Sequence, residues 1–331
     1  MMDSVLWNRI ELVSREFPET ETVQLAHERL RLFVKMETTN PSGSAKDRSA
    51  YWILREAVRR GDITRDTTVV ESSSGNFALS MALFCGRLGV RFIPVIDPNV
   101  NTSTETVLRR SCARVEKVAR IDRTGGYLLS RLDRVAELLA EIEDGYWPNQ
   151  YANIDGAQAH YELTGRELVA SLGDIDYLFV GVGSGAMIAG LSQRVAELST
   201  DVTVVAVDVA GSVIFGGEPR RRHIPGIGSS IRSPLVDKAM ISDVVVVSER
   251  EEVAGCHDLL RDHGIYAGGS TGCVYAAINR YFEGYRGPPP VVAFLCADRG
   301  EPYRDTIYDD SWVARTLMPD REVRDRSASA T

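Results

Sequence analysis

"TNPSGSAKDRSA" (residues 39–50) places a lysine between small hydroxyl residues and an Asp-Arg pair, just after Asn-Pro and a glycine. Lysine is rare here, because only four of the 38 lysines and arginines are lysines. Residues 30–37 predict a strand, and residues 45–61 have a helical period that ends at Gly61. Lys46 is therefore expected in a first helical turn, where the dipole lowers its pKa and favours a reactive free amine. For this segment alone, a solvated surface lysine remains the alternative.

Segments with strand and helix character alternate on both sides of this stretch. The predicted strands span residues 30–37, 67–73, 90–96, 114–119, 176–183, 202–209, 243–248 and 290–298. The predicted helices span residues 45–61, 76–89, 102–112, 126–144, 159–173, 186–198, 251–264 and 272–285. Apolar strands that alternate with helices are typical of α/β proteins with mostly parallel sheets covered on both faces. The two blocks of strands, divided around residues 145–155, predict two open α/β domains with a cleft between them.

The composition narrows the classes of partner. The formal net charge is -8, which argues against nucleic acid, because phosphate binding requires a basic stripe. The dense basic cluster at residues 220–223 is interpreted as a solvated loop, with an anion site as the alternative. No apolar run reaches the roughly 18–20 residues that span a bilayer, and no signal peptide is expected. The scattered cysteines and histidines lack metal-ligand spacing, so we expect no metal site and a reducing cytoplasm.

Three further strand-to-helix corners carry unusual polar or glycine-rich sequences. They are "ESSSGNFA" (71–78), "VGVGSGAMIAG" (180–190) and "AGGSTGCVYAA" (267–277). Ligands of open α/β sheets bind beyond the carboxyl ends of the strands. Hydroxyls and free backbone N–H groups at a helix start bind carboxylates or phosphates. Because four corners, including that of Lys46, carry matching chemistry, we expect one shared ligand site.

Each of these corners also has a simpler explanation. The serines at 72–74, and Ser270 with Thr271, are also ordinary helix caps. The glycines of residues 181–185 superficially resemble a dinucleotide fingerprint, for which Asp208 is the candidate acidic residue. A Walker-type nucleotide loop is excluded, because the sequence contains no G-K-[ST].

Together the four segments resemble the pyridoxal-phosphate enzymes of the cysteine synthase type, which have fold type II and include the tryptophan synthase β family. "NPSGSAKDR" resembles that family's lysine motif, "SSSGN" its asparagine loop, "GSGAM" its phosphate loop and "GGSTG" its pyridine-nitrogen loop. The order and spacing are similar over about residues 30–300. The resemblance implies pyridoxal 5'-phosphate in the cleft between a larger cofactor-binding domain (1–40 and 150–331) and a smaller, mobile substrate domain (41–149).

The resemblance also implies a role for each matching position. Lys46 would bind the cofactor covalently and act as the general base, Asn76 would hydrogen-bond its phenolic oxygen, and Ser270 would face its pyridine nitrogen. The phosphate would be wrapped by Gly183, Ser184, Gly185, Ala186 and Met187. The substrate carboxylate would be held by Ser73, Ser74 and Gln150. Two positions depart from the family pattern: Met187 stands where Thr or Ser is usual, and Phe77 stands where cysteine synthases often have Thr. Phe77 would thus be a substrate-binding residue that either removes one carboxylate donor or reshapes the pocket.

Further segments are similar to one subfamily, the N-(2-amino-2-carboxyethyl)-L-glutamate synthases. These segments include "GGYLLSRLDRVAELLAEIEDGYWPNQYAN", "GSVIFGGEP", "IPGIGSS", "GIYAGGSTG" and "ADRGEPYRDTIYDDSW". The subfamily makes a precursor of 2,3-diaminopropionate for siderophores and peptide antibiotics. The similarity implies a homodimeric transferase that joins O-phospho-L-serine and L-glutamate by β-elimination and replacement.

Two residues are candidates for binding the substrates, and both have alternatives. Arg131 would bind the leaving phosphate, or it is a solvated helix arginine. Tyr151 would hydrogen-bond a carboxylate or phosphate, or it packs in the core. For the whole protein, the competing functions are a cysteine synthase that uses O-acetylserine or O-phosphoserine with sulfide, and a non-catalytic nucleotide-binding protein.

Overall fold

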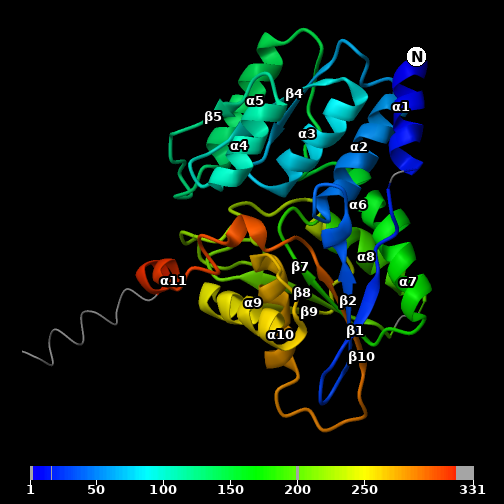
Figure 1. Ribbon diagram of the computed structural model, residues 1–331, viewed down its shortest axis with the longest axis vertical. Coiled ribbons are helices and arrows are strands. Elements are labelled where there is room, and N and C mark those ends of the chain that lie inside the picture. Colours follow the sequence, from blue (N-terminus) through cyan, green and yellow to red (C-terminus); the bar gives the residue numbers. More distant parts are fainter. Residues whose placement is uncertain (1–2, 16, 199–200, 318–331) are drawn as a thin grey trace, which may run out of the picture.

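The computed structural model describes residues 3–15, 17–198 and 201–317. Its larger sheet has the strand order β1-β2-β10-β7-β8-β9. These strands are β1 (Thr22–Leu25), β2 (Arg31–Met36), β10 (Val291–Cys296), β7 (Tyr177–Gly181), β8 (Thr203–Val209) and β9 (Asp243–Val247). Only the edge strand β1 pairs antiparallel within this sheet, and the other neighbours pair in parallel. Figure 1 shows this sheet in the lower half of the molecule.

The smaller sheet has the order β5-β4-β3-β6, and all its pairs are parallel. Its strands are β3 (Thr68–Ser72), β4 (Arg91–Ile96), β5 (Glu116–Lys117) and β6 (Gly145–Tyr146). The helices between and around these strands are α2 (Lys46–Arg60), α3 (Asn76–Leu88), α4 (Thr102–Ser111) and α5 (Leu128–Glu141). They occupy the upper half of Figure 1. The predicted α/β class with open, mostly parallel sheets is therefore confirmed.

Helix α1 (Ser4–Arg15) packs in the same core as α2 and α3. Its apolar face supplies Leu6, Ile10 and Val13, which are buried against residues such as Ile53. The predicted domain boundary had placed residues 1–40 with the larger sheet, and α1 departs from that placement. The amphipathic spacing of α1 could not show which of two cores it would cover. The division into a larger and a smaller domain stays a prediction.

Helices cover both faces of the larger sheet. One face carries α7 (Arg166–Leu172) and α8 (Ala186–Ala196), and the other carries α9 (Glu249–His263) and α10 (Gly269–Tyr281). Helix α6 (Ile154–Ala159) and a π-helical turn (His160–Gly165) pack against α8. The strand residues alternate accordingly: Leu178 and Val180 pack in the cluster of α8, whereas Phe179 packs in the cluster of α10. Successive side chains of a strand point to opposite faces, so a strand covered on both sides is apolar throughout.

Several boundaries differ from the predictions. The helix predicted from residue 159 begins at Ile154, where the Asn153 side chain accepts a hydrogen bond from the Asp155 amide. The helix predicted from residue 272 begins at Gly269, so Ser270 and Thr271 lie in its first turn rather than before it. Helix α1, strand β1 and helix α11 (Asp310–Leu317) were not predicted.

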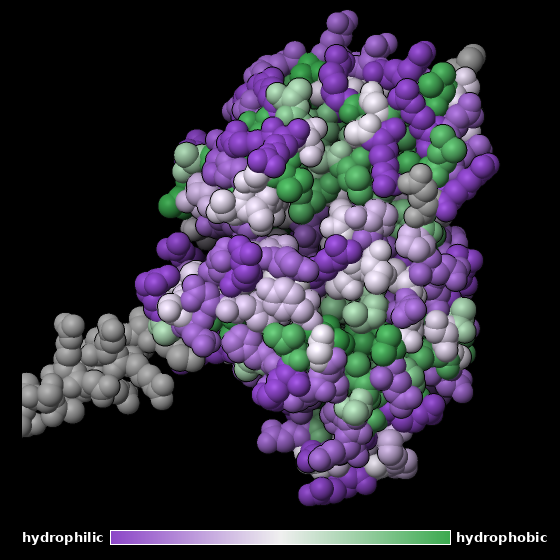
Figure 2. Space-filling model, viewed as in Figure 1, coloured by the Kyte–Doolittle hydropathy of each residue, from purple (hydrophilic) through white to green (hydrophobic). Residues whose placement is uncertain are grey.

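The described part of the chain contains no helix that is both long and apolar enough to cross a membrane. On the face shown in Figure 2, hydrophilic and hydrophobic residues are interspersed over both halves.

Candidate active site

The four predicted corners meet at one cavity of about 550 Å³. Its lining includes all the predicted site residues except Ala186: Lys46, Ser73, Ser74, Asn76, Phe77, Arg131, Gln150, Tyr151, Gly183, Ser184, Gly185, Met187 and Ser270. Ala186 is the buried first residue of α8 and lies in the chain between the lining residues Gly185 and Met187. Residues from both sheets contribute, because parallel strands end at the same edge and the following turns therefore converge.

Lys46 is the first residue of α2 and lies half-buried on the wall of the cavity. Among the residues that the structure describes, none forms a hydrogen bond or ion pair with its Nζ atom. Burial lowers the pKa of Lys46, and the nearby Asp298 carboxylate opposes this shift. Burial is thus the larger cause, where the sequence had suggested the helix dipole. A lysine with a lowered pKa keeps a larger fraction of its amine free to react.

Asp298 is a member of the site that the sequence analysis missed. It follows the carboxyl end of β10 and is buried. Its Oδ2 atom accepts hydrogen bonds from Asn76 Nδ2 at 2.7 Å and from the Tyr303 hydroxyl at 2.8 Å. Burial raises the pKa of Asp298, and these hydrogen bonds with the charge of Lys46 oppose the rise. The signal in the sequence was an acidic residue directly after a buried strand.

The predicted phosphate loop connects β7 to α8. Gly185 has a φ of +86°, and a Cβ atom there would lie 2.8 Å from a side-chain carbon of Val236. Only glycine therefore fits this turn. The first N–H groups of a helix have no acceptor within the helix, so the start of α8 is suited to an anion. Ser184 and Met187 both line the cavity beside it.

Arg131 and Ser74 form a polar cluster with Asp97, which was not predicted. The Ser74 hydroxyl donates to Asp97 Oδ2 at 2.8 Å, and Arg131 Nη1 donates to the Ser74 hydroxyl at 3.3 Å. Arg131 Nε lies 3.1 Å from Asp97 Oδ2, and its side chain is only 12% exposed. Arg131 is therefore not a solvated helix arginine, but part of its charge is already balanced by Asp97.

Gln150 and Ser73 are held mainly by backbone groups. Gln150 Nε2 donates to the Ser72 carbonyl at 3.0 Å, and the Ser73 hydroxyl accepts from the Ala78 amide at 3.2 Å. Burial raises the pKa of Tyr151, and the neighbouring Arg131 opposes this shift. Phe77 is buried in the core of α2 and α3, where its ring fills space.

Two buried titratable groups near the cavity were also missed. Glu71 accepts hydrogen bonds from the Ser72 amide at 2.7 Å and from Trp147 Nε1 at 3.3 Å. Burial raises the pKa of Glu71 to about 7. His160, at the start of the π-helical turn, lies 3.0 Å from the hydroxyls of both Ser49 and Thr164. Burial, with the charges of Lys46 and Arg48, lowers its pKa to about 3, so it is neutral at physiological pH.

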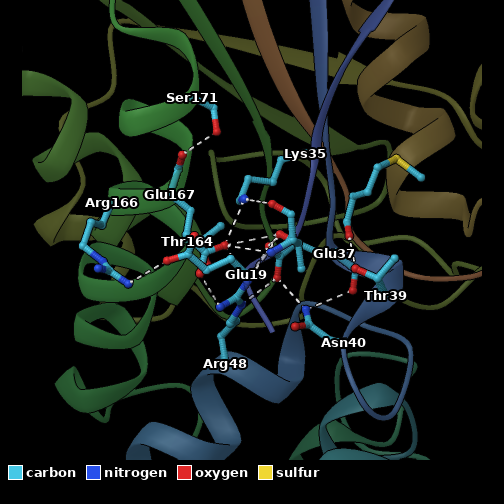
Figure 3. Close-up of polar contacts among 12 residues, drawn as sticks. Glu19, Lys35, Glu37, Thr39, Asn40, Arg48, Thr164, Arg166, Glu167 and Ser171 are labelled. Atoms are coloured by element: carbon cyan, nitrogen blue, oxygen red, sulfur yellow. Dashed lines mark hydrogen bonds and ion pairs between the residues drawn. The ribbon is translucent and has the colours of Figure 1, made fainter. Parts of the chain in front are cut away.

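Buried ion pairs fix the start of α2 to the larger sheet. Arg48, two residues after Lys46, forms ion pairs with Glu167 of α7 at 2.7 Å and with Glu37 at 3.1 Å. Lys35 of β2 lies 2.9 Å from Glu167. Figure 3 shows these side chains converging from three separate segments of the chain. The network orients the helical turn that carries Lys46.

The basic cluster at residues 220–223 also lines the cavity. Arg220 and Arg221 are exposed, as predicted for a solvated loop, but Arg222 and His223 are half-buried. The interpretation of the whole cluster as a solvated loop is therefore wrong. Its position on the cavity wall was set by packing between the segments that follow β8 and β9, which the local sequence does not report.

Comparisons with known proteins agree with this geometry. An N-(2-amino-2-carboxyethyl)-L-glutamate synthase from Ralstonia nicotianae is 39% identical over 301 residues, which cover 89% of each chain. The crystal structure of an O-acetylserine dependent cystathionine beta-synthase from Helicobacter pylori is similar with a TM-score of 0.82 and 25% identity. It covers 93% of this chain and 100% of that one. A hydrogen sulfide-producing enzyme from Fusobacterium nucleatum has a TM-score of 0.81 and 25% identity, over 92% of this chain and 100% of that one.

The family model described as "Pyridoxal-phosphate dependent enzyme" matches residues 14–297. This range contains Lys46, the four corners and every strand of both sheets, and it leaves out most of helix α1 and the segment after residue 297. The chain belongs to the pyridoxal-phosphate dependent enzymes.

Proposed function

We propose that this enzyme joins O-phospho-L-serine and L-glutamate by β-replacement, giving N-(2-amino-2-carboxyethyl)-L-glutamate and phosphate. The observation that carries the proposal is the charge of the cavity. Four arginines line it, namely Arg131, Arg220, Arg221 and Arg222, against the two carboxylates of Asp97 and Asp298. The protein as a whole has a net charge of -8, so this local excess of cations is suited to two anionic substrates. The 39% identity to a synthase of this name supports the same reaction.

The residues of the cavity fit pyridoxal phosphate. The Lys46 amine has no partner among the described residues and is accessible from the cavity. The start of α8 with Ser184 offers an anion site on the same wall. Asn76 would supply the polar group for the oxygen on the cofactor ring, and Ser270 would supply the polar group for the ring nitrogen. When bound, this cofactor withdraws electrons from the Cα atom of the attached amino acid.

The protein residues then orient the substrates and move protons. The Lys46 amine removes the proton from Cα and later returns it, and its lowered pKa favours both steps. Ser73, Ser74 and Gln150 hold the α-carboxylate. The bond between Cβ and the phosphate oxygen breaks with departure of phosphate, whose charge Arg131 stabilises. The glutamate amine then forms a bond to Cβ in place of the phosphate oxygen, and the proton that the amine loses balances the one taken up by the released phosphate.

Product analysis tests this reaction. Enzyme loaded with pyridoxal phosphate is incubated with O-phospho-L-serine and either glutamate or sulfide, and the products are identified by mass spectrometry. We expect the glutamate adduct, together with one phosphate for each adduct. Cysteine from sulfide, with no glutamate adduct, would instead establish a cysteine synthase.

One observation favours that alternative. Arg131 is already paired with Asp97, which weakens its attraction for a phosphate dianion and suits a donor such as O-acetylserine.

Arg131→Ala should lower kcat/KM with O-phosphoserine roughly 10- to 100-fold, through loss of a charge-assisted contact, and should affect O-acetylserine much less. Arg134→Ala is the control, because Arg134 lies on the same helix but does not line the cavity. Equal losses with both donors would show that Arg131 supports the structure only.

Three further proposals follow from the resemblance. The enzyme is a homodimer, it acts in the cytoplasm, and its product serves the synthesis of 2,3-diaminopropionate for a siderophore or peptide antibiotic. The five cysteines support the reducing compartment, because all of them are free thiols. Sedimentation of the purified enzyme tests the dimer.

A further inference from the structure

Arg222 lines the cavity and has no direct counter-ion among the residues that the structure describes. Its Nη2 atom donates to the Ser230 hydroxyl at 3.3 Å, whereas Nη1 is buried and has no hydrogen-bond partner within the described part of the chain. No carboxylate of the described residues forms an ion pair with it. Arg232 of the same segment pairs with Asp237, and the His223 side chain contacts Glu249. Arg220 and Arg221 also form no ion pair among the described residues, but both are exposed to solvent, whereas Arg222 is half-buried.

The acidic groups around Arg222 do not compensate its charge directly. Glu249 accepts hydrogen bonds from His223 and from the Ile224 amide. The buried carboxyl oxygens of Glu252 have no hydrogen-bond partner in residues 3–15, 17–198 and 201–317. Burial, with the charges of Glu249 and Asp298, raises the pKa of Glu252 well above the usual value. Burial also raises the pKa of Asp208. None of these carboxyl groups forms an ion pair with the guanidinium, so Nη1 has no acceptor among the described residues.

The position of the guanidinium is fixed by tight packing. Gly228 has a φ of +72°, and a Cβ atom at this position would overlap Arg222 Nη1. Ser230, which holds Nη2, also faces the loop before α5, since a Cβ on Gly126 would lie 3.6 Å from the Ser230 hydroxyl. Arg222 therefore stands where the loops of the two sheets meet across the cavity, near enough to Tyr151 for the two to interact electrostatically.

Leaving a buried guanidinium N–H unsatisfied is unfavourable, because the group has lost its water without gaining an acceptor. Such a group is expected where a ligand supplies the missing oxygen. The planar fork of arginine matches a carboxylate, which accepts two parallel hydrogen bonds. An incoming carboxylate would thus satisfy Nη1 and balance the charge at once.

We propose that Arg222 binds a carboxylate of the second amino-acid substrate, the nucleophile, and so selects an acidic amino acid. This inference rests on the proposed function. The donor already has Ser73, Ser74 and Arg131 on the side of the smaller sheet, whereas Arg222 comes from the segment between β8 and β9 of the larger sheet. A nucleophile must approach Cβ after the leaving group has departed, and glutamate brings two carboxylates into the cavity. Sulfide would need no such cation.

The test compares Arg222→Met with Lys238→Met in the enzyme loaded with pyridoxal phosphate. Lys238 lies in the same segment, is exposed and does not line the cavity, so its variant removes the same charge outside the site. For Arg222→Met we expect the KM for glutamate to rise roughly 10- to 100-fold. The concentration of O-phosphoserine that gives half of the absorbance change without glutamate should stay within about twofold. Lys238→Met should match the wild type in both measurements.

Arg222→Lys, which keeps the charge but not the fork, should recover part of the affinity for glutamate. A wild-type KM for glutamate in Arg222→Met would overturn this inference but not the proposed function. A change confined to the half-saturating concentration of O-phosphoserine would also overturn it, because it would assign Arg222 to the phosphate of the donor. A wild-type enzyme that forms no product from glutamate would instead overturn the proposed function, and this inference with it. Circular dichroism and cofactor absorbance confirm that each variant is folded and loaded.

Discussion

Glu167→Gln should lower the free energy of unfolding by roughly 3–5 kcal/mol, because it removes one charge from a balanced, buried network. The network contains two cations, Lys35 and Arg48, and two carboxylates, Glu37 and Glu167, each at most 4% exposed in its side chain. Glu167 makes more contacts with cations than Glu37 does. Arg48 donates to it with Nη1 at 2.7 Å and with Nη2 at 2.8 Å. Lys35 adds a contact at 2.9 Å (Figure 3).

The expected loss of stability in Glu167→Gln reflects the charge and the acceptor atoms that a glutamine amide lacks. Gln has the shape of Glu, but it leaves one uncompensated positive charge among groups that have no access to water. It also turns an N–H group toward donors that need acceptors, among them the Thr20 amide, which donates to Glu167 Oε2 at 3.2 Å. Breaking a buried pair in this way typically destabilises by about 3–5 kcal/mol, whereas an exposed pair contributes about 0–1 kcal/mol.

The assay is urea unfolding at a fixed, saturating concentration of pyridoxal phosphate, followed by circular dichroism and tryptophan fluorescence. The surface control is Glu137→Gln, which breaks an ion pair of Arg134 with a Glu137 side chain that is 60% exposed. We expect it to change the free energy of unfolding by less than about 1 kcal/mol.

A second variant separates charge balance from packing. Lys35→Met combined with Glu167→Gln removes one charge of each sign, so the double variant should be more stable than the sum of the single changes predicts, by about 0.5–3 kcal/mol. A loss below about 1 kcal/mol in Glu167→Gln, or strict additivity in the double variant, would refute the view that charge balance stabilises this network.

The remaining predictions concern the cavity itself. Lys46→Ala should abolish both the visible absorbance of lysine-bound pyridoxal phosphate and turnover. Asn76→Ala and Ser270→Ala should keep the fold but lower kcat/KM, each by about 1–3 kcal/mol of lost polar contact, as steady-state kinetics would show. Glu71 has a folded pKa of about 7 against an ordinary value of 4.5, so its stability contribution is full below pH 4.5 and is lost as pH rises through 7. Glu71→Gln should remove this pH dependence, which amounts to roughly 3 kcal/mol in urea unfolding at pH 4.5 and 7.5.

Distinct results would contradict each of these. Wild-type turnover in Lys46→Ala would end the proposed mechanism. Unchanged kinetics in both Asn76→Ala and Ser270→Ala would mean that the cofactor lies elsewhere in the cavity. Equal pH profiles of stability for Glu71→Gln and the wild type would show that burial does not shift this carboxyl group.

The alternation of apolar strands with amphipathic helices was enough to predict the α/β class and most of the strands and helices. The four strand-to-helix corners were also predicted from the sequence, because a turn after a strand is built from adjacent residues whose chemistry is visible locally. Lys46 was correctly expected in the first turn of its helix. Short elements such as β1 and β6 were missed, because four or two residues carry too little periodicity to identify a strand.

The hydrogen-bond and ion-pair partners of the site residues were visible only in the tertiary structure, because they lie on segments far apart in the chain. Asp298 lies 222 residues from Asn76, and Glu167 lies 119 residues from Arg48. No local pattern encodes such a pair, because a side chain's charge balance and burial depend on which surfaces the folded chain brings against it. For the same reason, the sequence could not show that Arg131 is paired with Asp97, nor that Arg222 faces the cavity with an unsatisfied nitrogen. Local chemistry determined which residues were candidates, and long-range packing determined which of their charges remain free for a ligand.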